Sequence, residues 1–223
     1  MKALIIVLVF INSTFINSFE KTIDSVKNDI MIDELYKHPK FKNWIDFWKL
    51  KMPEVNNFVL EKTDTIGRKY YTKIDLEKWF NERELREFTL DFSPEKDYVT
   101  DIYSHVGFEY KNDSIYVMGG DVDPSFVIIN IKDSMLYYLT FGPYSFFDES
   151  IWLSDSTCYI LGFAFDDSRQ NVSEAYSRII ILEWNFNKNS LVVSKSNKLP
   201  FKNKLMSFQT YMDYLYPNFH HSK

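Results

Sequence analysis

A series of short strand-like segments between Leu90 and Ser196 constrains the fold more than any other feature of the sequence. Apolar and aromatic runs alternate there with turns rich in Asn, Asp and Ser, which hydrogen-bond their own backbone and tolerate left-handed conformations. Turn signals recur about every eight to twelve residues, a spacing typical of antiparallel meanders and sandwiches. We therefore predict a mostly β, α+β protein with an antiparallel core. The expected strands are 99–103, 107–110, 115–118, 126–131, 136–141, 158–165, 179–186 and 191–193.

The same layout occurs twice within this stretch. One copy opens with Leu90–Ser104 and the other with Ser150–Phe165, and each opening combines a Ser-containing turn with a strand-like run. Each copy later contains a dense β-branched strand, Phe126–Ile131 in the first and Arg178–Trp184 in the second. Strand Leu136–Phe141 is apolar on both faces, and such strands need cover on both sides. The pattern predicts two meander sheets, stacked on each other or covered by helices.

The opening of the first copy, Phe92–Val99, resembles the blade repeats of secreted bacterial β-propellers, where an aromatic-Ser-Pro-Asp-Gly-Lys run starts an inner strand. Ile151–Gly162 is similar to a second opening. Lys96 stands where the repeat usually has glycine, and the second copy lacks the proline. A closed propeller needs about four to eight blades. The resemblance therefore implies two blade-like antiparallel meander sheets, an incomplete β-propeller-like arrangement, and the whole layout is similar to small exported bacterial proteins.

Helical patterns flank the β region on both sides. Apolar residues recur at helical spacing over 20–36 and again over 41–48, and the two segments are separated by His38-Pro39. Trp44 and Trp48 are expected to pack these helices on the sheet, and Trp152 and Trp184 to lie between the sheets. Three further elements are expected: short strands at 57–60 and 69–74 joined by a turn at 64–67, a short helix capped by Asp75, and a C-terminal helix over 205–216.

The N-terminus has the pattern of a secretory signal peptide. Lys2 precedes the apolar run Ala3–Ile11, which is too short to span a bilayer as a helix, and the small residue Ser18 follows at a suitable distance for cleavage. A buried core helix is the alternative. We expect export to the periplasm or the extracellular space as a soluble protein, with no stable membrane insertion after signal removal. Because no Cys lies near Ser18, the chain is not expected to be a lipoprotein.

These patterns divide the chain into four parts. They are a signal peptide (1–18), an N-terminal helical cap with short strands (19–89), a β-meander core with two degenerate repeats (90–199), and a C-terminal helix and tail (200–223). The single cysteine, Cys158, cannot form an internal disulfide and is interpreted as a buried thiol. The net charge of −5 and the absence of a basic run argue against a nucleic-acid partner.

Two acidic loops and one His–Asp pair are the candidate sites. The loops around Asp121 and Asp166 could hold a hard cation such as calcium, but neither has the spacing of an EF-hand, and turn roles are the favoured interpretation. Asp101 and His105 could act as an acid–base pair. No metalloprotease, phosphate-loop or dinucleotide motif occurs. We therefore assign no catalytic, cofactor-binding or metal-binding residue, and no cofactor.

Three functions are compatible with these features. The first is an exported, non-catalytic binding or interaction module for an unknown protein, peptide or glycan. The second is a hydrolase that uses Asp and His residues on loops at one sheet edge, which requires Asp101, His105, Asp121 and Asp123 to converge. The third is an envelope inhibitor or immunity-type protein, suggested by small size, acidity and export. A fold of this kind does not by itself choose among them.

Overall fold

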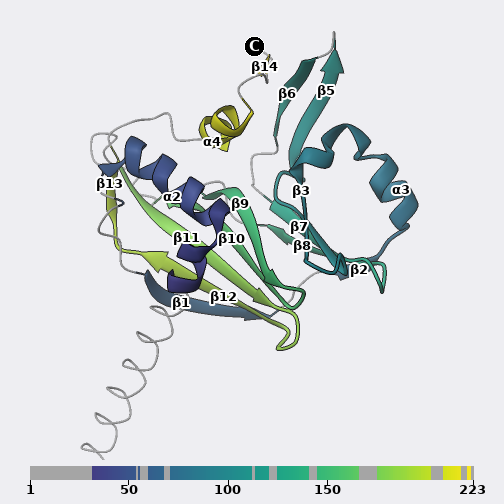
Figure 1. Cartoon of the computed structure of the whole chain (residues 1–223), viewed down its shortest axis with the longest axis horizontal. Coiled ribbons are helices and arrows are strands. Elements are labelled where there is room, and N and C mark those ends of the chain that lie inside the picture. The colour runs from purple at the N-terminus through teal and green to yellow at the C-terminus, as the bar shows by residue number, and fades with distance from the viewer. Residues whose placement is uncertain are drawn as a thin grey trace, which may run out of the picture.

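Two antiparallel sheets lie side by side and form most of the molecule (Figure 1). The mostly β, α+β fold class with several antiparallel sheets is confirmed. The segment predicted to be a signal peptide and the loops around Asp121 and Asp166 lie outside the described residues. The computed structural model describes residues 32–53, 55, 60–67, 71–111, 114–120, 125–140, 145–165, 175–201, 208–216 and 220–221.

The larger sheet has six strands in the order β1-β12-β11-β10-β9, with β13 paired to β11. Strands β9 to β12 follow one another along the chain and are joined as antiparallel neighbours. β1 comes from the N-terminal part of the chain and adds to the free edge of β12. The bounds are β1 (Leu60–Gly67), β9 (Ser145–Ser154), β10 (Thr157–Phe165), β11 (Ala175–Asn185), β12 (Ser190–Ser196) and β13 (Leu199–Phe201).

The smaller sheet has five strands in the order β2-β8-β7-β4-β3. Here β2 adds to the edge of β8, just as β1 adds to β12 in the larger sheet. A hairpin of β5 and β6 is inserted between β4 and β7, and it pairs with the short β14 in a sheet of its own. The bounds are β2 (Tyr71–Lys73), β3 (Leu90–Phe92), β4 (Tyr98–Asp101), β5 (Val106–Lys111), β6 (Ser114–Gly120), β7 (Ser125–Asn130), β8 (Met135–Thr140) and β14 (His220–His221).

Helices cover the sheets. A short helix over residues 32–37 ends at His38, and Pro39 begins the next helix, where the missing N–H of proline costs no hydrogen bond. The predicted cap of α3 is confirmed, because Asp75 Oδ1 accepts a hydrogen bond of 3.1 Å from the backbone N–H of Lys78. The helices are α2 (Pro39–Lys51), α3 (Leu76–Asn81), the 3₁₀ helix η2 (Glu84–Thr89) and α4 (Phe208–Leu215). No helix in the described segments has the length and apolar composition needed to cross a bilayer.

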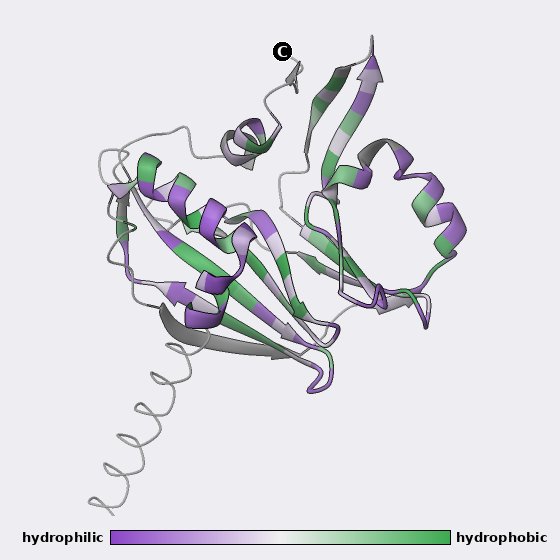
Figure 2. Cartoon of the chain, in the orientation of Figure 1, coloured by the Kyte–Doolittle hydropathy of each residue, from purple (hydrophilic) through white to green (hydrophobic). Residues whose placement is uncertain are grey.

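The cover of the larger sheet differs between its faces. On one face α2 packs Trp44 and Trp48 against Phe163 of β10, with ring centroids 5.7 and 4.7 Å apart, as predicted for these tryptophans. On the other face, Trp152 and Trp184 lie in the core shared with the smaller sheet. Burial of each large apolar side chain contributes about 1.5–3 kcal/mol, so both faces stabilise the fold. Figure 2 shows the hydrophobic residues along the strands.

Cys158 lies in the core between the sheets and is fully buried, as predicted. Burial raises the pKa of its thiol well above the usual value, with the charge of Asp91 adding to the effect, so the thiol stays protonated. Cys158 is therefore a core residue.

Two local predictions were wrong. The segment 64–67 was predicted to be a turn, but it belongs to β1, where Ile66 pairs with Leu191 of β12. The β-branched residues Thr65 and Ile66 suit a strand, and the open edge of β12 gives that strand a partner. No strand was expected between residues 142 and 157, yet β9 (Ser145–Ser154) lies there and carries two acidic residues through the sheet.

Candidate functional site

A pocket of about 230 Å³ lies at the junction of the two large sheets. Its walls come from α2, η2, β3, the turn after β4, β9 and α4, so segments distant in sequence converge on it. β3 and β9, which belong to different sheets, contact each other at this point. The volume corresponds to about eight water molecules at about 30 Å³ each. The pocket therefore has room for a small molecule.

A lysine on α2 joins both sheets at the pocket. Lys40 Nζ lies 2.9 Å from Asp91 Oδ1 and 3.2 Å from Glu149 Oε1, and it donates to the carbonyl oxygen of Ser150 at 3.3 Å. Burial alone would lower the pKa of the Lys40 ammonium, but the charges of Glu149 and Asp91 outweigh it and raise the pKa above the usual value. The three hydrogens of the ammonium all have acceptors. Lys40 is thus a fixed positive charge.

Asp91 is held in place by the neighbouring strands. Ser150 Oγ donates to Asp91 Oδ2 at 3.2 Å and accepts from Thr100 Oγ1 at 2.9 Å. The indole N–H of Trp152 donates to the carbonyl oxygen of Asp91 at 3.1 Å. These bonds connect β3, β4 and β9, so the carboxylate that receives Lys40 has little freedom to move.

Asp148 is the most unusual residue of the pocket, because it is a carboxyl group with 1% exposure. Trp44 and Trp48, one turn apart on α2, donate their indole N–H groups to the same oxygen, Oδ2, at 2.9 Å each. The other oxygen, Oδ1, has no hydrogen-bond partner among the described residues. Burial raises the pKa of Asp148 well above its usual value despite the two indole bonds, and the charge of Glu149 adds to the rise.

The protonation state of Asp148 follows from these contacts. A raised pKa favours the neutral acid, and the oxygen that accepts two N–H bonds is the carbonyl oxygen of that acid. The proton therefore lies on Oδ1, the oxygen without a described partner. Asp148 thus presents an O–H donor in the wall of the pocket, and buried carboxylic acids kept neutral in this way are used as hydrogen-bond donors at functional sites.

Three tyrosines complete the wall. The Tyr103 hydroxyl donates to the backbone carbonyl oxygen of Asp148 at 2.7 Å, and the Tyr216 hydroxyl donates to the backbone carbonyl oxygen of Phe88 at 3.1 Å. Tyr211 is fully buried, and its hydroxyl has no hydrogen-bond partner within the described segments. Burial raises the pKa of all three phenols, and the negative charge of Glu149 adds to the rise. They are neutral hydroxyl groups at physiological pH.

The residues that the sequence analysis singled out do not form this pocket. Asp101 is fully buried and accepts from Arg83 Nε at 3.3 Å and from Thr89 Oγ1 at 3.3 Å, so it ties η2 to β4. The ring nitrogen Nδ1 of His105 lies 2.9 Å from the carbonyl oxygen of Ser125 and therefore carries the proton. Both residues have structural contacts.

The acidic loops cannot be placed. Asp121, Asp123, Asp166 and Asp167 lie outside the described residues, so their convergence and a cation site on them stay predictions. In the described part of the chain, no group of three or more His, Cys, Asp or Glu residues is arranged to hold a metal ion.

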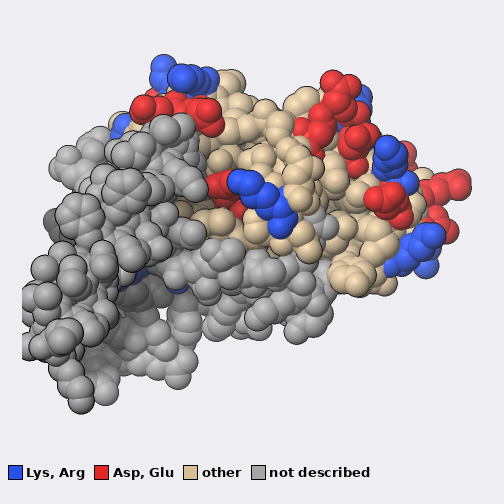
Figure 3. Space-filling model, turned by 90° about the horizontal axis from the view of Figure 1, so that it is seen from below, with Lys and Arg blue, Asp and Glu red and all other residues tan. Residues whose placement is uncertain are grey.

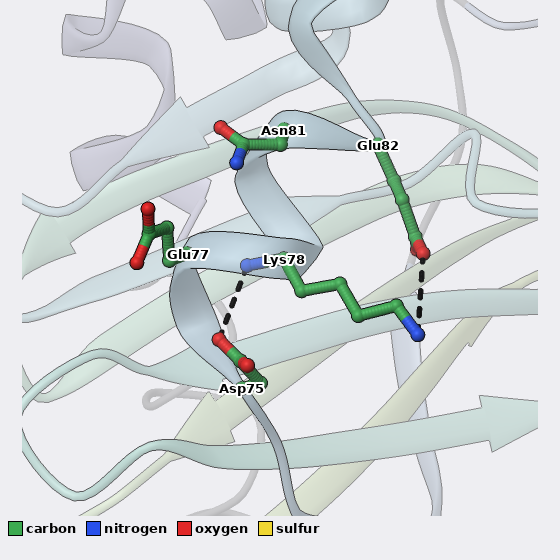
Figure 4. Close-up of a pocket in the computed structure, with 5 residues that line it drawn as sticks. All are labelled: Asp75, Glu77, Lys78, Asn81 and Glu82. Carbon is green, nitrogen blue, oxygen red and sulfur yellow. Dashed lines mark hydrogen bonds and ion pairs between the residues drawn. The ribbon is translucent and has the colours of Figure 1, made fainter.

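A second, wider hollow of about 410 Å³ runs along α3 (Figure 4). Its polar side chains already serve the helix: Asp75 caps it, and Lys78 Nζ lies 3.9 Å from Glu82 Oε1. Figure 3 shows Lys and Arg side chains close to Asp and Glu on the described surface of that view, without a continuous basic area. Among the described residues that line the hollow, Asp75, Lys78 and Glu82 are therefore used within the helix itself.

Comparisons of this chain with protein-family models, with curated proteins and with solved structures found no match.

Proposed function

We propose that the protein is an exported, non-catalytic binding module whose ligand site is the pocket formed by α2, β3, β9 and α4. The observation that carries the proposal is the buried carboxyl of Asp148, which has one oxygen without a hydrogen-bond partner among the described residues. The hydroxyl of Tyr211, in the same pocket wall, also has no hydrogen-bond partner among the described residues. A buried polar group without a partner costs about 1–3 kcal/mol. A ligand that hydrogen-bonds to either group recovers part of this free energy on binding.

Binding is favoured over turnover by the state of the candidate nucleophiles. The Lys40 amine is held as an ammonium by two carboxylates. The Cys158 thiol has a raised pKa and lies in the core. The Ser150 hydroxyl donates to Asp91, and no histidine is among the described residues that line the pocket. Covalent catalysis needs an activated nucleophile next to a base, and these groups do not provide that pair.

A pocket-blocking variant tests the proposal. Asn43 lines the pocket from the exposed side of α2, so Asn43→Trp should fill the entrance without changing the core. Leu50→Trp is the matched control, because Leu50 lies on the same helix, is 83% exposed and does not line the pocket. In a screen of amine, alcohol, carboxylate and sugar fragments by protein-observed NMR, binding should be lost only in Asn43→Trp. The proposal is wrong if no fragment binds, or if both variants bind equally.

We also propose that the two large sheets are degenerate copies of one blade-like unit, as the resemblance in the sequence implies. In each sheet four strands occur in chain order, and the last of them receives an added strand from 60–73. The Ser-containing turns of the two openings lie together, since the backbone N–H of Glu95 donates to Asp155 Oδ1 at 2.9 Å. The proposal requires β3-β4-β7-β8 to superpose on β9-β10-β11-β12 strand for strand. A different strand order would contradict this relationship.

A further inference from the structure

The geometry points to a small protonated amine as the ligand of this pocket, bound between the Glu149 carboxylate and the aromatic side chains around Tyr211. This inference rests on the proposed function, because it assigns a ligand class to the same pocket. Three independent features carry it: the charge balance of the wall, the acceptors that the wall leaves unused, and the aromatic rings that line the pocket.

The wall has an excess of negative charge. With Asp148 in its neutral form, the charged residues among the described lining residues are Lys40, Asp91 and Glu149. Burial raises the pKa of Glu149, but the charge of Lys40 and the hydrogen bonds from Lys40 and Ser150 oppose the rise and stabilise the ionised form that this inference requires. One ammonium therefore faces two carboxylates, and it lies within 3.2 Å of both. Since a partly enclosed site of low dielectric strengthens such charges, the pocket attracts a cation and repels an anion.

The unused acceptors match an ammonium. Glu149 Oε1 accepts from Lys40 Nζ and from the backbone N–H of Ser150, and the described residues offer donors to this oxygen only. Glu149 Oε2 and the Tyr211 hydroxyl are thus acceptors for incoming N–H groups. Lys40 has no further hydrogen to give, because Asp91, Glu149 and the Ser150 carbonyl take all three. A carboxylate or phosphate ligand would find no charged donor here.

Aromatic rings provide the remaining surface. Phe88, Tyr103, Tyr211 and Tyr216 line the pocket, and the rings of Phe88 and Tyr216 contact each other with centroids 5.1 Å apart. The face of an aromatic ring attracts a cation and also packs against a short alkyl chain. A small amine carries both parts, a charged head for Glu149 and an apolar stem for the rings.

A matched series of probes tests the ligand class on the full mature protein. Propylammonium, propanol and propionate have nearly the same size and differ in charge. We expect calorimetric titration at neutral pH to show binding of propylammonium, with at least about tenfold weaker binding of the other two. If propanol or propionate binds as well as propylammonium, and Asn43→Trp abolishes this binding, the amine is the wrong ligand class but the pocket is still the binding site. Absence of binding by all three probes and by the wider fragment screen would overturn both.

Two variants assign the binding to named groups. Glu149→Gln should weaken propylammonium binding by about tenfold or more, since a hydrogen bond to a charged group is lost. Glu109→Gln, at an exposed pair with Lys111, is the charge-matched control and should bind as the parent protein does. If Glu149→Gln unfolds, Tyr211→Phe decides, because it removes only a hydroxyl that has no described partner. The Tyr211→Phe variant should keep its thermal stability and still bind propylammonium several-fold more weakly. Unchanged propylammonium affinity in the folded variants would overturn the inference.

Discussion

Lys40 of α2 and Asp91 of β3 form a 2.9 Å ion pair that joins the helix covering the larger sheet to the edge strand of the smaller sheet. Their side chains are 39% and 23% exposed, so solvent screens the pair in part. An exposed ion pair contributes about 0–1 kcal/mol. The pair therefore matters mainly for the geometry of the pocket, since it fixes the charged group at the junction of the two sheets.

A double-mutant cycle measures this connection. Lys40→Met and Asp91→Asn each remove one partner, and the coupling energy between them should be about 0.5–1 kcal/mol by urea denaturation. A more exposed pair on β5 offers the control, where Lys111 Nζ lies 3.2 Å from Glu109 Oε1 and the side chains are 59% and 43% exposed. The same cycle at Lys111 and Glu109 should give a coupling near zero. Equal coupling at the two places would contradict a structural role for Lys40.

The pH dependence of stability should depend on Asp148. Its pKa is raised in the folded state and close to 3.8 when the chain is unfolded. The folded protein therefore holds a proton that the unfolded chain has lost, and the free energy of unfolding falls as the pH rises from near 4 to the raised pKa. Lys40, Asp91, Glu149, Tyr103, Tyr211 and Tyr216 are the ionisable groups that face Asp148 across the pocket.

Asp148→Asn isolates this contribution. Its carbonyl oxygen can still accept both indole N–H groups, and its amide cannot ionise, so it resembles the protonated acid. We expect the variant to equal the parent protein near pH 4 and to become more stable than the parent as the pH rises. Denaturation curves at several pH values measure the difference. A constant difference between the two proteins over this range would show that Asp148 is not the titrating group.

A lysine in the turn between β3 and β4 limits the stability of the protein. Lys96 has a φ of 61°, in the left-handed region that favours glycine. Glycine has no steric penalty there, and the gain is partly offset by the greater entropy of the unfolded chain. Lys96→Gly should raise the free energy of unfolding by about 0.5–1 kcal/mol. Lys132 lies in a turn but has no positive φ, so Lys132→Gly should lower the free energy of unfolding. If both variants are less stable than the parent protein, the positive φ of Lys96 does not limit stability.

The strands could be predicted because they are local patterns. Phe126–Ile131 and Arg178–Trp184 are dense β-branched runs bounded by turn residues, and both became central strands of their sheets. The Asp75 cap followed from one residue and its place in front of an apolar helical pattern. The strands added at the sheet edges were harder to predict, because the pairing of β1 with β12 depends on an open edge far along the chain.

The pocket could not be predicted in this way. Its central contacts join residues about a hundred positions apart, such as Trp48 and Asp148, and no local periodicity reports them. One signal was available: Asp148 and Glu149 are adjacent acids inside the aromatic and apolar run of β9. Charged residues in such a strand are costly to bury unless they have a function or a partner, so this pair could have been selected as a candidate.

The two indole bonds to Asp148 should be strongly non-additive. Trp44→Phe or Trp48→Phe alone leaves Oδ2 with one donor, whereas the double variant leaves neither oxygen of a buried carboxyl with a described partner. The double variant should therefore lose about 1–2 kcal/mol more than the sum of the single losses, measured by chemical denaturation. In an Asp148→Leu background the shared acceptor is gone, and the two substitutions should become additive. Coupling that persists in that background would assign it to the packing of both rings on Phe163 instead.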